Sequence, residues 1–215
     1  MNEVELYHIH RYNENNRLWV PGKTIYVTPD WMSEMYKQYI NFHQTITISN
    51  YQVSGVMLFS DWLDQTIFSL NQYSVLNRQQ IMALKDILEK AKILSDYADI
   101  FKREQALEAY RQKYFPDLPS RLHSLYLCDE AGLEYWKKTL DSSSDMPSKE
   151  SHIFKVKVNG RVFKTDEQLL PMEVLNYQDT YEGASLYWNP THLDSHKESV
   201  EYLAQGEVQI LKRIN

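Results

Sequence analysis

The sequence is poor in cysteine and in glycine, and each scarcity excludes a class of site. Its one cysteine, Cys128, has no second cysteine for a disulfide, and it cannot build a cysteine-based zinc site within the chain. The six glycines are scattered, so the chain has neither a P-loop nor a Rossmann dinucleotide fingerprint. A G-x-S-x-G nucleophile elbow is also missing.

Long apolar runs and positive charge are scarce as well. No apolar run approaches the ~20 residues that span a bilayer, and the opening MNEVELYHIH lacks the basic and apolar regions of a signal peptide. We therefore expect a cytoplasmic protein that makes no membrane contact. The formal net charge of -6 argues against non-specific nucleic-acid binding, which depends on clustered Lys and Arg.

Aromatic residues, in contrast, are abundant. The chain has 16 tyrosines and 5 tryptophans, and 43% of its residues are hydrophobic, which is enough for a globular core. Aromatic side chains of this kind pack in cores, but they also line pockets for flat ligands.

Segments rich in β-forming side chains predict strands in the first 28 residues and again from residue 124 onward. These strands lie at 4–11, at 24–28, at 124–128 and near the end, within 201–214. On the first strand, His8 and His10 share one face because side chains alternate along a strand. A helix that contains Leu133 and Trp136 is predicted after residues 124–128.

The residues IFKVKVNGRVFK predict a β-hairpin. Asn159 and Gly160 are the pair preferred in a two-residue type I′ turn, and Phe154, Val156 and Val158 alternate with charged residues before it. We therefore expect the chain to reverse its direction at Asn159 and Gly160.

Between the strands, the spacing of apolar residues predicts helices. Thr28 and Pro29 resemble an N-cap and a first helical residue, and apolar residues recur at helical spacing within 56–70. The clearest helix follows Asn77, and another at 103–113 ends at the prolines of FPDLPSR. The apolar stripe of the helix after Asn77 consists of Ile81, Leu84, Leu88, Ala91 and Leu94.

The order of strands, helices and then strands predicts an α+β fold rather than a doubly wound sheet. We expect residues 1–29 and 115–215 to form one mixed core. Residues 30–114 would then be a helical insertion packed on that core, so that the chain is a single domain.

The histidines and the cysteine suggest two kinds of chemistry, metal binding and nucleophilic catalysis. His8, His10, His192 and His196 could together hold zinc, which would make the protein a metal-dependent hydrolase, but histidines so widely spaced are more often hydrogen-bonded singly. Cys128 lies between apolar residues, which favours a buried, inert thiol over a nucleophile.

Three short stretches, LYHIHR, SLYLCD and ESVEYLAQGEVQILK, carry a resemblance to a known superfamily. They are similar to the three motifs of ADP-ribosyltransferase-like proteins of the His-Tyr-Glu type. The resemblance implies a split β-sheet core and NAD as the bound nucleotide and substrate. It also implies that His8 and Tyr126 bind NAD with Ser124 beside them, and that Glu201, or else Glu198, is the catalytic carboxylate.

A further stretch, ALEAYRQKYFPDLPSRLHSLYLCDEAGLEYW, resembles a family of uncharacterised bacterial proteins with an E-x-x-R helix before F-P-x-x-P-S-R. Arg121 follows the two prolines directly. It either binds a pyrophosphate with two hydrogen bonds or clamps the chain through a carboxylate such as Glu108. Glu108 and Arg111 are expected to form a surface ion pair.

Each of these residues also has a structural reading. His8 and Tyr126 would then be core residues, and Glu201 would be a solvated charge before the last strand. Tyr187 and Trp188, predicted in a loop, would either contact a ligand or fill the core.

The preferred function is therefore that of an NAD-binding, ADP-ribosyltransferase-like protein that transfers ADP-ribose or hydrolyses NAD. The acceptor is not identified. The alternative is a non-catalytic interaction module that keeps the fold and dimerises through the insertion.

Overall fold

The computed structural model describes most of the chain in eleven stretches. These are residues 3–11, 19–33, 36–37, 45–49, 54–58, 67–68, 77–142, 151–172, 175–191, 193 and 197–214. The chain forms two compact units: Met1–Ser33 together with Arg103–Asn215, and Glu34–Lys102. The second unit lies within the predicted insertion, 30–114.

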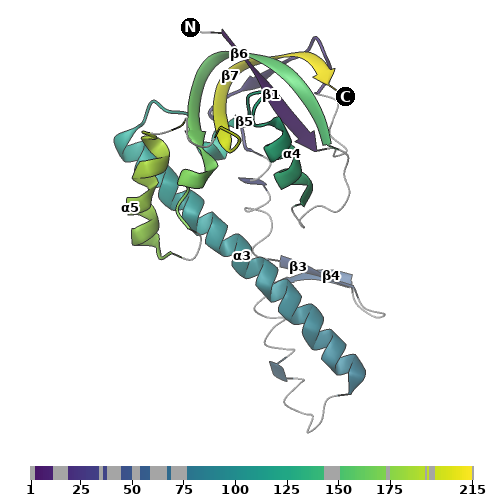
Figure 1. The fold of residues 1–215 in the computed structure, drawn as a ribbon. Coiled ribbons are helices and arrows are strands. Elements are labelled where there is room, and N and C mark those ends of the chain that lie inside the picture. Colours follow the sequence, from purple (N-terminus) through teal and green to yellow (C-terminus); the bar gives the residue numbers. More distant parts are fainter. Residues whose placement is uncertain are drawn as a thin grey trace. The chain divides into compact units, whose positions relative to one another are not determined.

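The first unit is built on one antiparallel sheet (Figure 1). Its strands are β1 (Glu3–Arg11), β2 (Thr24–Val27), β5 (Leu125–Leu127), β6 (Ser151–Asp166) and β7 (Val200–Ile214). The order is β1-β6-β7-β2, and β5 pairs with the first part of β7. The fold is thus mixed α and β, as predicted at that level.

An isolated bridge joins β1 to the end of β5. Tyr7 of β1 and Cys128, just after β5, exchange two backbone hydrogen bonds of 2.8 Å and 2.9 Å. Because β1 pairs with β6, β6 with β7 and β7 with β5, this bridge closes the strands into a ring. Figure 1 shows that β6 and β7 are strongly curved.

The two faces of the sheet are covered by different apolar clusters. We call one the barrel face; its cluster includes Leu6, Phe154, Val156 and Ile210. The other, the helix face, packs against α3 (Arg78–Tyr114) and α5 (Tyr177–Trp188). Its cluster consists of Leu107, Ala184, Tyr187, Trp188 and Leu203, with Tyr126 and Phe163 at its margin.

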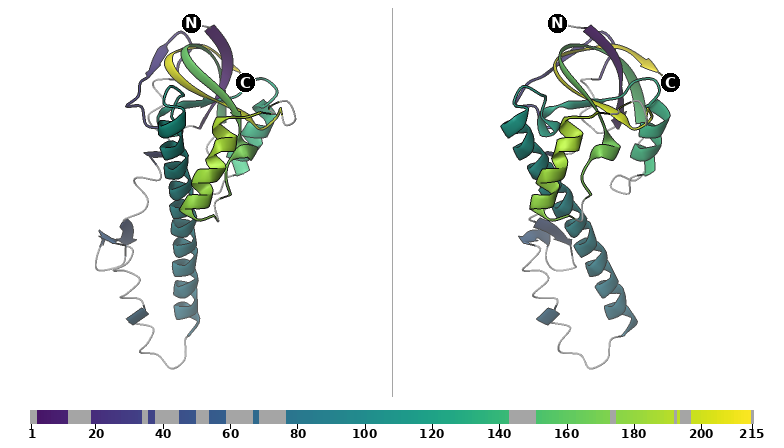
Figure 2. Two further views of the ribbon diagram at one scale, coloured as in Figure 1. Left: turned by 90° about the vertical axis from the view of Figure 1, so that its left-hand side faces the viewer. Right: turned by 60° about the vertical axis from the view of Figure 1, so that its left-hand side comes forward.

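The helices begin where side chains cap them. Asn77 and Gln80 bond each other's backbone N–H at 3.1 Å and 2.8 Å, which confirms the predicted capping box of α3. Asn176 caps α5 in a similar way. Figure 2 shows α5 beside the C-terminal part of α3, and the Trp188 indole N–H donates to Leu107 O at 2.9 Å. The helix predicted after residues 124–128 is α4 (Leu133–Ser142).

The predicted hairpin at Asn159 and Gly160 is wrong, because β6 runs straight through both residues. Asn159 pairs with Glu207, and Gly160 pairs with Gly206 of β7. A Cβ on Gly160 would lie 2.1 Å from Gln205 O. This glycine therefore permits a close approach of two bent strands instead of a turn.

Several helix predictions also need correction. Residues 28–33 are irregular, although residues 36–37 are helical as predicted. Ser54–Leu58 is a strand, β4, that pairs with β3 (Thr45–Ser49) in the second unit, whereas residues 67–68 of the same predicted helix are helical. The β-branched residues of TITIS supply the pairing partner that apolar spacing alone did not reveal. The helices predicted at Asn77 and at 103–113 are one helix, α3. Ile81 and Leu88 of its predicted stripe are exposed, and Ile87 is buried instead.

Candidate functional site

A buried charge network lies on the helix face, with Arg121 at its centre. The Arg121 guanidinium donates through Nη1 to Glu201 Oε1 and to Tyr187 Oη, both at 2.5 Å, and through Nε to Glu104 Oε2 at 2.9 Å. Tyr187 Oη in turn donates to Glu201 Oε1 at 2.6 Å. We call these four residues the Arg121 network. It joins α3, α5 and β7 to the short 3-10 helix η2 (Arg121–His123).

The charges of the network are balanced, as burial requires. Glu104, Arg121, Tyr187 and Glu201 are each at most 4% exposed. Arg103 approaches Glu104 at 3.5 Å, so two cations face two carboxylates. Burial lowers the pKa of Arg121, but the carboxylates of Glu104 and Glu201 outweigh it and hold that pKa well above its usual value.

The stiff segment before η2 is held by a second ion pair. Glu108 and Arg111 bond through two contacts of 2.7 Å and 3.0 Å, and Arg111 also donates to the carbonyls of Pro116 and Leu118. Ser120 donates to Glu108 at 2.8 Å. The predicted surface pair is therefore largely buried. The predicted clamp at Arg121 exists, but it acts on Glu104 and Glu201 rather than on Glu108.

Tyr126 and Ser124 lie next to the network. Tyr126 Oη donates to Arg121 O at 2.9 Å, and the Arg121 guanidinium lies 5.3 Å from the centre of the Tyr126 ring. Ser124 is fully buried, and its hydroxyl has no hydrogen-bond partner among the residues that the structure describes. Arg121 and Tyr126, five positions apart, thus come together with Glu201 from a distant part of the chain, and all three were predicted from the sequence.

His8 lies on the other side of the sheet. It pairs with Phe154 across β1 and β6, and its ring stacks on Trp19 at 4.1 Å, so it belongs to the barrel face. Its Nδ1 lies 3.0 Å from Tyr126 O. The strand backbone therefore separates the His8 ring from the Glu201 carboxylate on the helix face.

The His8 imidazole is neutral and has a defined tautomer. Burial lowers the pKa of His8 to about 3, while the hydrogen bond to Tyr126 raises it. A carbonyl only accepts, so Nδ1 carries the proton. Within the described residues Nε2 makes no hydrogen bond, and it is left as an acceptor.

Most of the other residues identified from the sequence are buried. Glu201 lies inside β7 and is buried, so it is not a solvated charge before a strand; Glu198 is exposed in the preceding turn. Tyr187 and Trp188 end α5 and are buried, so the prediction of a loop is wrong and their core reading is confirmed. Cys128 is buried, and burial raises the pKa of its thiol to about 12, consistent with an inert thiol.

Neither a metal centre nor a membrane span is found in the described parts of the chain. There, no three His, Cys, Asp or Glu side chains are grouped so that they could hold a metal ion. His192 and His196 lie outside the described residues. None of the described helices has an apolar stretch long enough to cross a bilayer.

A family described as "Protein of unknown function (DUF2441)" matches residues 6–215, which include every residue of the Arg121 network and its surroundings. The chain belongs to this family. A search of curated proteins found no match.

Some residues of this DUF2441 protein's site were missed by sequence reasoning. Glu104 could have been found as a partner of Arg121, because it lies four residues before Glu108, the predicted partner, and therefore on the same face of the helix. Trp19, which stacks on His8, had no periodic neighbours to indicate its role. Tyr187 was identified from the sequence as a ligand or core residue, but its hydrogen bond to Glu201 was not predicted.

The unpartnered hydroxyl of Ser124 leads to a prediction about stability. We expect Ser124→Ala to leave the free energy of unfolding unchanged or to raise it by up to about 1 kcal/mol, because a buried hydroxyl without a partner is unfavourable. Ser199 is the matched control: it is equally buried and donates to Asp166 Oδ1 at 2.6 Å. Ser199→Ala should lose about 1.5–3 kcal/mol. Urea denaturation compares them, and a loss of similar size in both variants would contradict the assignment.

Glu167 provides a pH-dependent prediction for this DUF2441 protein. Burial raises the pKa of Glu167, and nearby Glu201 adds to this, whereas the hydrogen bond from Tyr135 at 2.8 Å and the charges of Arg121 and Arg103 lower it.

Because the folded-state pKa is raised, the protonated group stabilises the fold at acidic pH, and this contribution is lost as pH rises through the folded-state pKa. Glu167→Gln keeps an acceptor for Tyr135 but cannot ionise. We expect it to melt a few degrees higher than wild type at pH 7 and at the same temperature near pH 4. Thermal melts across pH measure this, and a variant that melts lower at pH 7 would refute it.

Proposed function

We propose that this protein binds a nucleotide of the NAD type on the barrel face and does so without catalysis by Glu201. The starting point is its resemblance to ADP-ribosyltransferase-like proteins, in which the residue at the position of His8 holds a ribose of NAD. The observation that carries the proposal is that His8 and Glu201 lie on opposite faces of one sheet.

The barrel face offers suitable contacts for such a ligand. His8 presents Nε2 as an acceptor, which suits a ribose hydroxyl that donates a hydrogen bond. Trp19, only partly buried, provides a flat indole beside it at 4.1 Å. Flat rings of nicotinamide or adenine stack on such surfaces with little loss of side-chain freedom.

The environment of Glu201 favours a structural role. A carboxylate that stabilises a developing oxocarbenium ion must reach the reacting sugar. Glu201 is 3% exposed and accepts hydrogen bonds from both Arg121 and Tyr187. A ribose held by His8 would be separated from it by the strand backbone.

Binding and turnover are tested together. We expect millimolar NAD to raise the melting temperature of wild type and of Glu201→Gln alike, and of His8→Gln much less, with no nicotinamide released. A ligand at 100 times its Kd stabilises by about 2.7 kcal/mol, which corresponds to roughly 5–10 °C in a chain of this size. The absence of any shift in wild type would end the proposal.

A second candidate is ADP-ribosyl transfer or NAD hydrolysis with Glu201 as the catalytic carboxylate. One observation favours it: Tyr126 and Glu201, which the resemblance assigns to the NAD site, both lie beside Arg121, the candidate pyrophosphate ligand. Release of nicotinamide by wild type, with loss of release in Glu201→Gln, would establish this candidate and overturn the first. Dimerisation through residues 30–114 stays a prediction.

A further inference from the structure

The sheet contains a β-bulge that changes which residue of β7 reaches the barrel face. Ile210 pairs with Val156, but Lys212 pairs with Lys155, so Leu211 is an extra residue in β7. Without it, simple alternation after Val208 and Ile210 would put Lys212 on the barrel face. With it, Arg213 pairs with Phe154 and lies on that face instead. Bulges that redirect a side chain are frequent next to functional sites.

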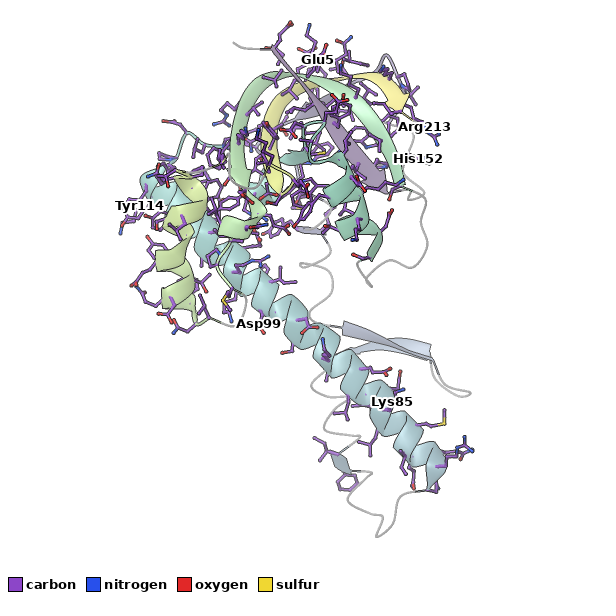
Figure 3. The ribbon with its side chains drawn as sticks, in the orientation of Figure 1. Glu5, Lys85, Asp99, Tyr114, His152 and Arg213 are labelled. Carbon is purple, nitrogen blue, oxygen red and sulfur yellow. The ribbon has the colours of Figure 1, made fainter. Side chains whose placement is uncertain are left out.

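Arg213 meets a buried histidine there. Its Nη2 lies 2.6 Å from His152 Nδ1. Because a guanidinium only donates, this nitrogen of His152 accepts and carries no proton. His152 is 8% exposed, whereas Arg213 is exposed. Figure 3 labels the two residues at the same edge of the sheet.

No carboxylate neutralises Arg213 among the described residues. The ion pairs that β6 and β7 form within the described residues involve other side chains, such as Lys155 with Glu5 and Lys157 with Glu3. A guanidinium has five N–H donors, and His152 uses one of them. The remaining donors form the planar arrangement that suits phosphate or carboxylate oxygens.

The same end of the barrel face carries further imidazole and indole groups. His152 lies directly opposite His10 in the pairing of β6 with β1. His10 stacks on Trp19 at 5.0 Å, and Trp19 stacks on His8. The barrel face thus presents neighbouring groups of three kinds at this end: the Arg213 guanidinium, the imidazoles of His152 and His10, and the Trp19 indole.

We propose that Arg213, with His152 and His10, forms an anion subsite that takes a phosphate or carboxylate group of a ligand whose flat ring contacts Trp19. The anion subsite would be part of the nucleotide site proposed above, so its assignment to a nucleotide rests on that proposed function. The anion contact itself needs no nucleotide, so inorganic pyrophosphate serves as the probe.

The test compares two neighbouring cations of β7. Arg213→Gln removes the charge on the barrel face, and Lys212→Gln removes an equal charge one residue away, on the other face. We expect calorimetry at low salt to show pyrophosphate binding to wild type, weakened by about tenfold or more in Arg213→Gln and little changed in Lys212→Gln. Equal weakening in both variants, or no binding to wild type, would overturn the subsite.

NAD separates this proposal from the preceding one. If pyrophosphate binds through Arg213 but NAD binds to no variant, the subsite stands and the NAD assignment fails. If NAD binds wild type and Arg213→Gln equally well, the NAD assignment stands and the subsite fails. Arg213 is exposed, so its replacement does not threaten the fold.

Discussion

Replacement of Arg121 by methionine is expected to lower the free energy of unfolding by about 3–5 kcal/mol, since it leaves buried carboxylates without their counter-charge. Glu104 and Glu201 both bond the Arg121 guanidinium, and neither is more than 3% exposed. In a chain of this size the loss corresponds to a fall in melting temperature on the order of 10 °C. Urea denaturation followed by circular dichroism measures it.

Two further variants make this expectation specific. Arg161 is an exposed arginine that donates to Gln205 Oε1 at 2.7 Å, so Arg161→Met should lose less than about 1 kcal/mol. Adding Glu201→Gln to Arg121→Met removes one of the two carboxylate charges left without a counter-charge, and it should restore part of the lost free energy of unfolding. If Arg121→Met is as stable as Arg161→Met, the network does not hold the fold.

The second large effect is expected where Gly160 of β6 pairs with Gly206 of β7. A Cβ on Gly160 would lie 2.1 Å from Gln205 O and 2.9 Å from Gly206 Cα. Because these are backbone atoms, no side chain can move to relieve the clash. We expect Gly160→Ala to lose at least about 3 kcal/mol and to give little soluble protein. Gly206→Ala should behave similarly, since its φ of +127° is also unfavourable for alanine.

Gly183 is the control for these substitutions. It lies inside α5, where a Cβ would meet only Pro171 at ordinary van der Waals distance, 3.4 Å. In a helix interior, alanine is more stable than glycine by roughly 0.5–1 kcal/mol. Gly183→Ala should therefore match or exceed the stability of wild type. Wild-type stability in Gly160→Ala would show that the two strands can move apart.

The strands and their buried faces could be predicted from the sequence because alternation is a local signal. The predicted alternation of Phe154, Val156 and Val158 with charged residues is confirmed, since all three are buried in one core cluster. Val208 and Ile210 of the last predicted strand are buried in the same cluster. The strand at residues 4–11 and the short strand in SLYLC were also found, since β-branched and aromatic residues are dense there. Local patterns of this kind do not depend on which strand pairs with which.

Features decided by distant partners could not be predicted in the same way. Asn159 and Gly160 have the local signature of a turn, yet Gly206, 46 positions after Gly160, determines that the chain continues straight. The choice of Glu104 over Glu108 as the partner of Arg121 depends on how Ser120 occupies Glu108. The face on which His8 lies, opposite Glu201, follows from the register of β1, β6 and β7, which no single segment encodes.

The pairing of β1 with β6 has a consequence for how the protein is made. The partner of Arg11 is Ser151, so about 140 residues must leave the ribosome before the first strand finds its neighbour. At roughly 5–20 residues per second, that delay lasts on the order of ten to thirty seconds. During this interval an edge rich in Leu, Ile, Tyr and His is unpaired. Such nascent chains are the ones on which chaperones act, and slowed elongation after residue 11 would lower the yield of folded protein.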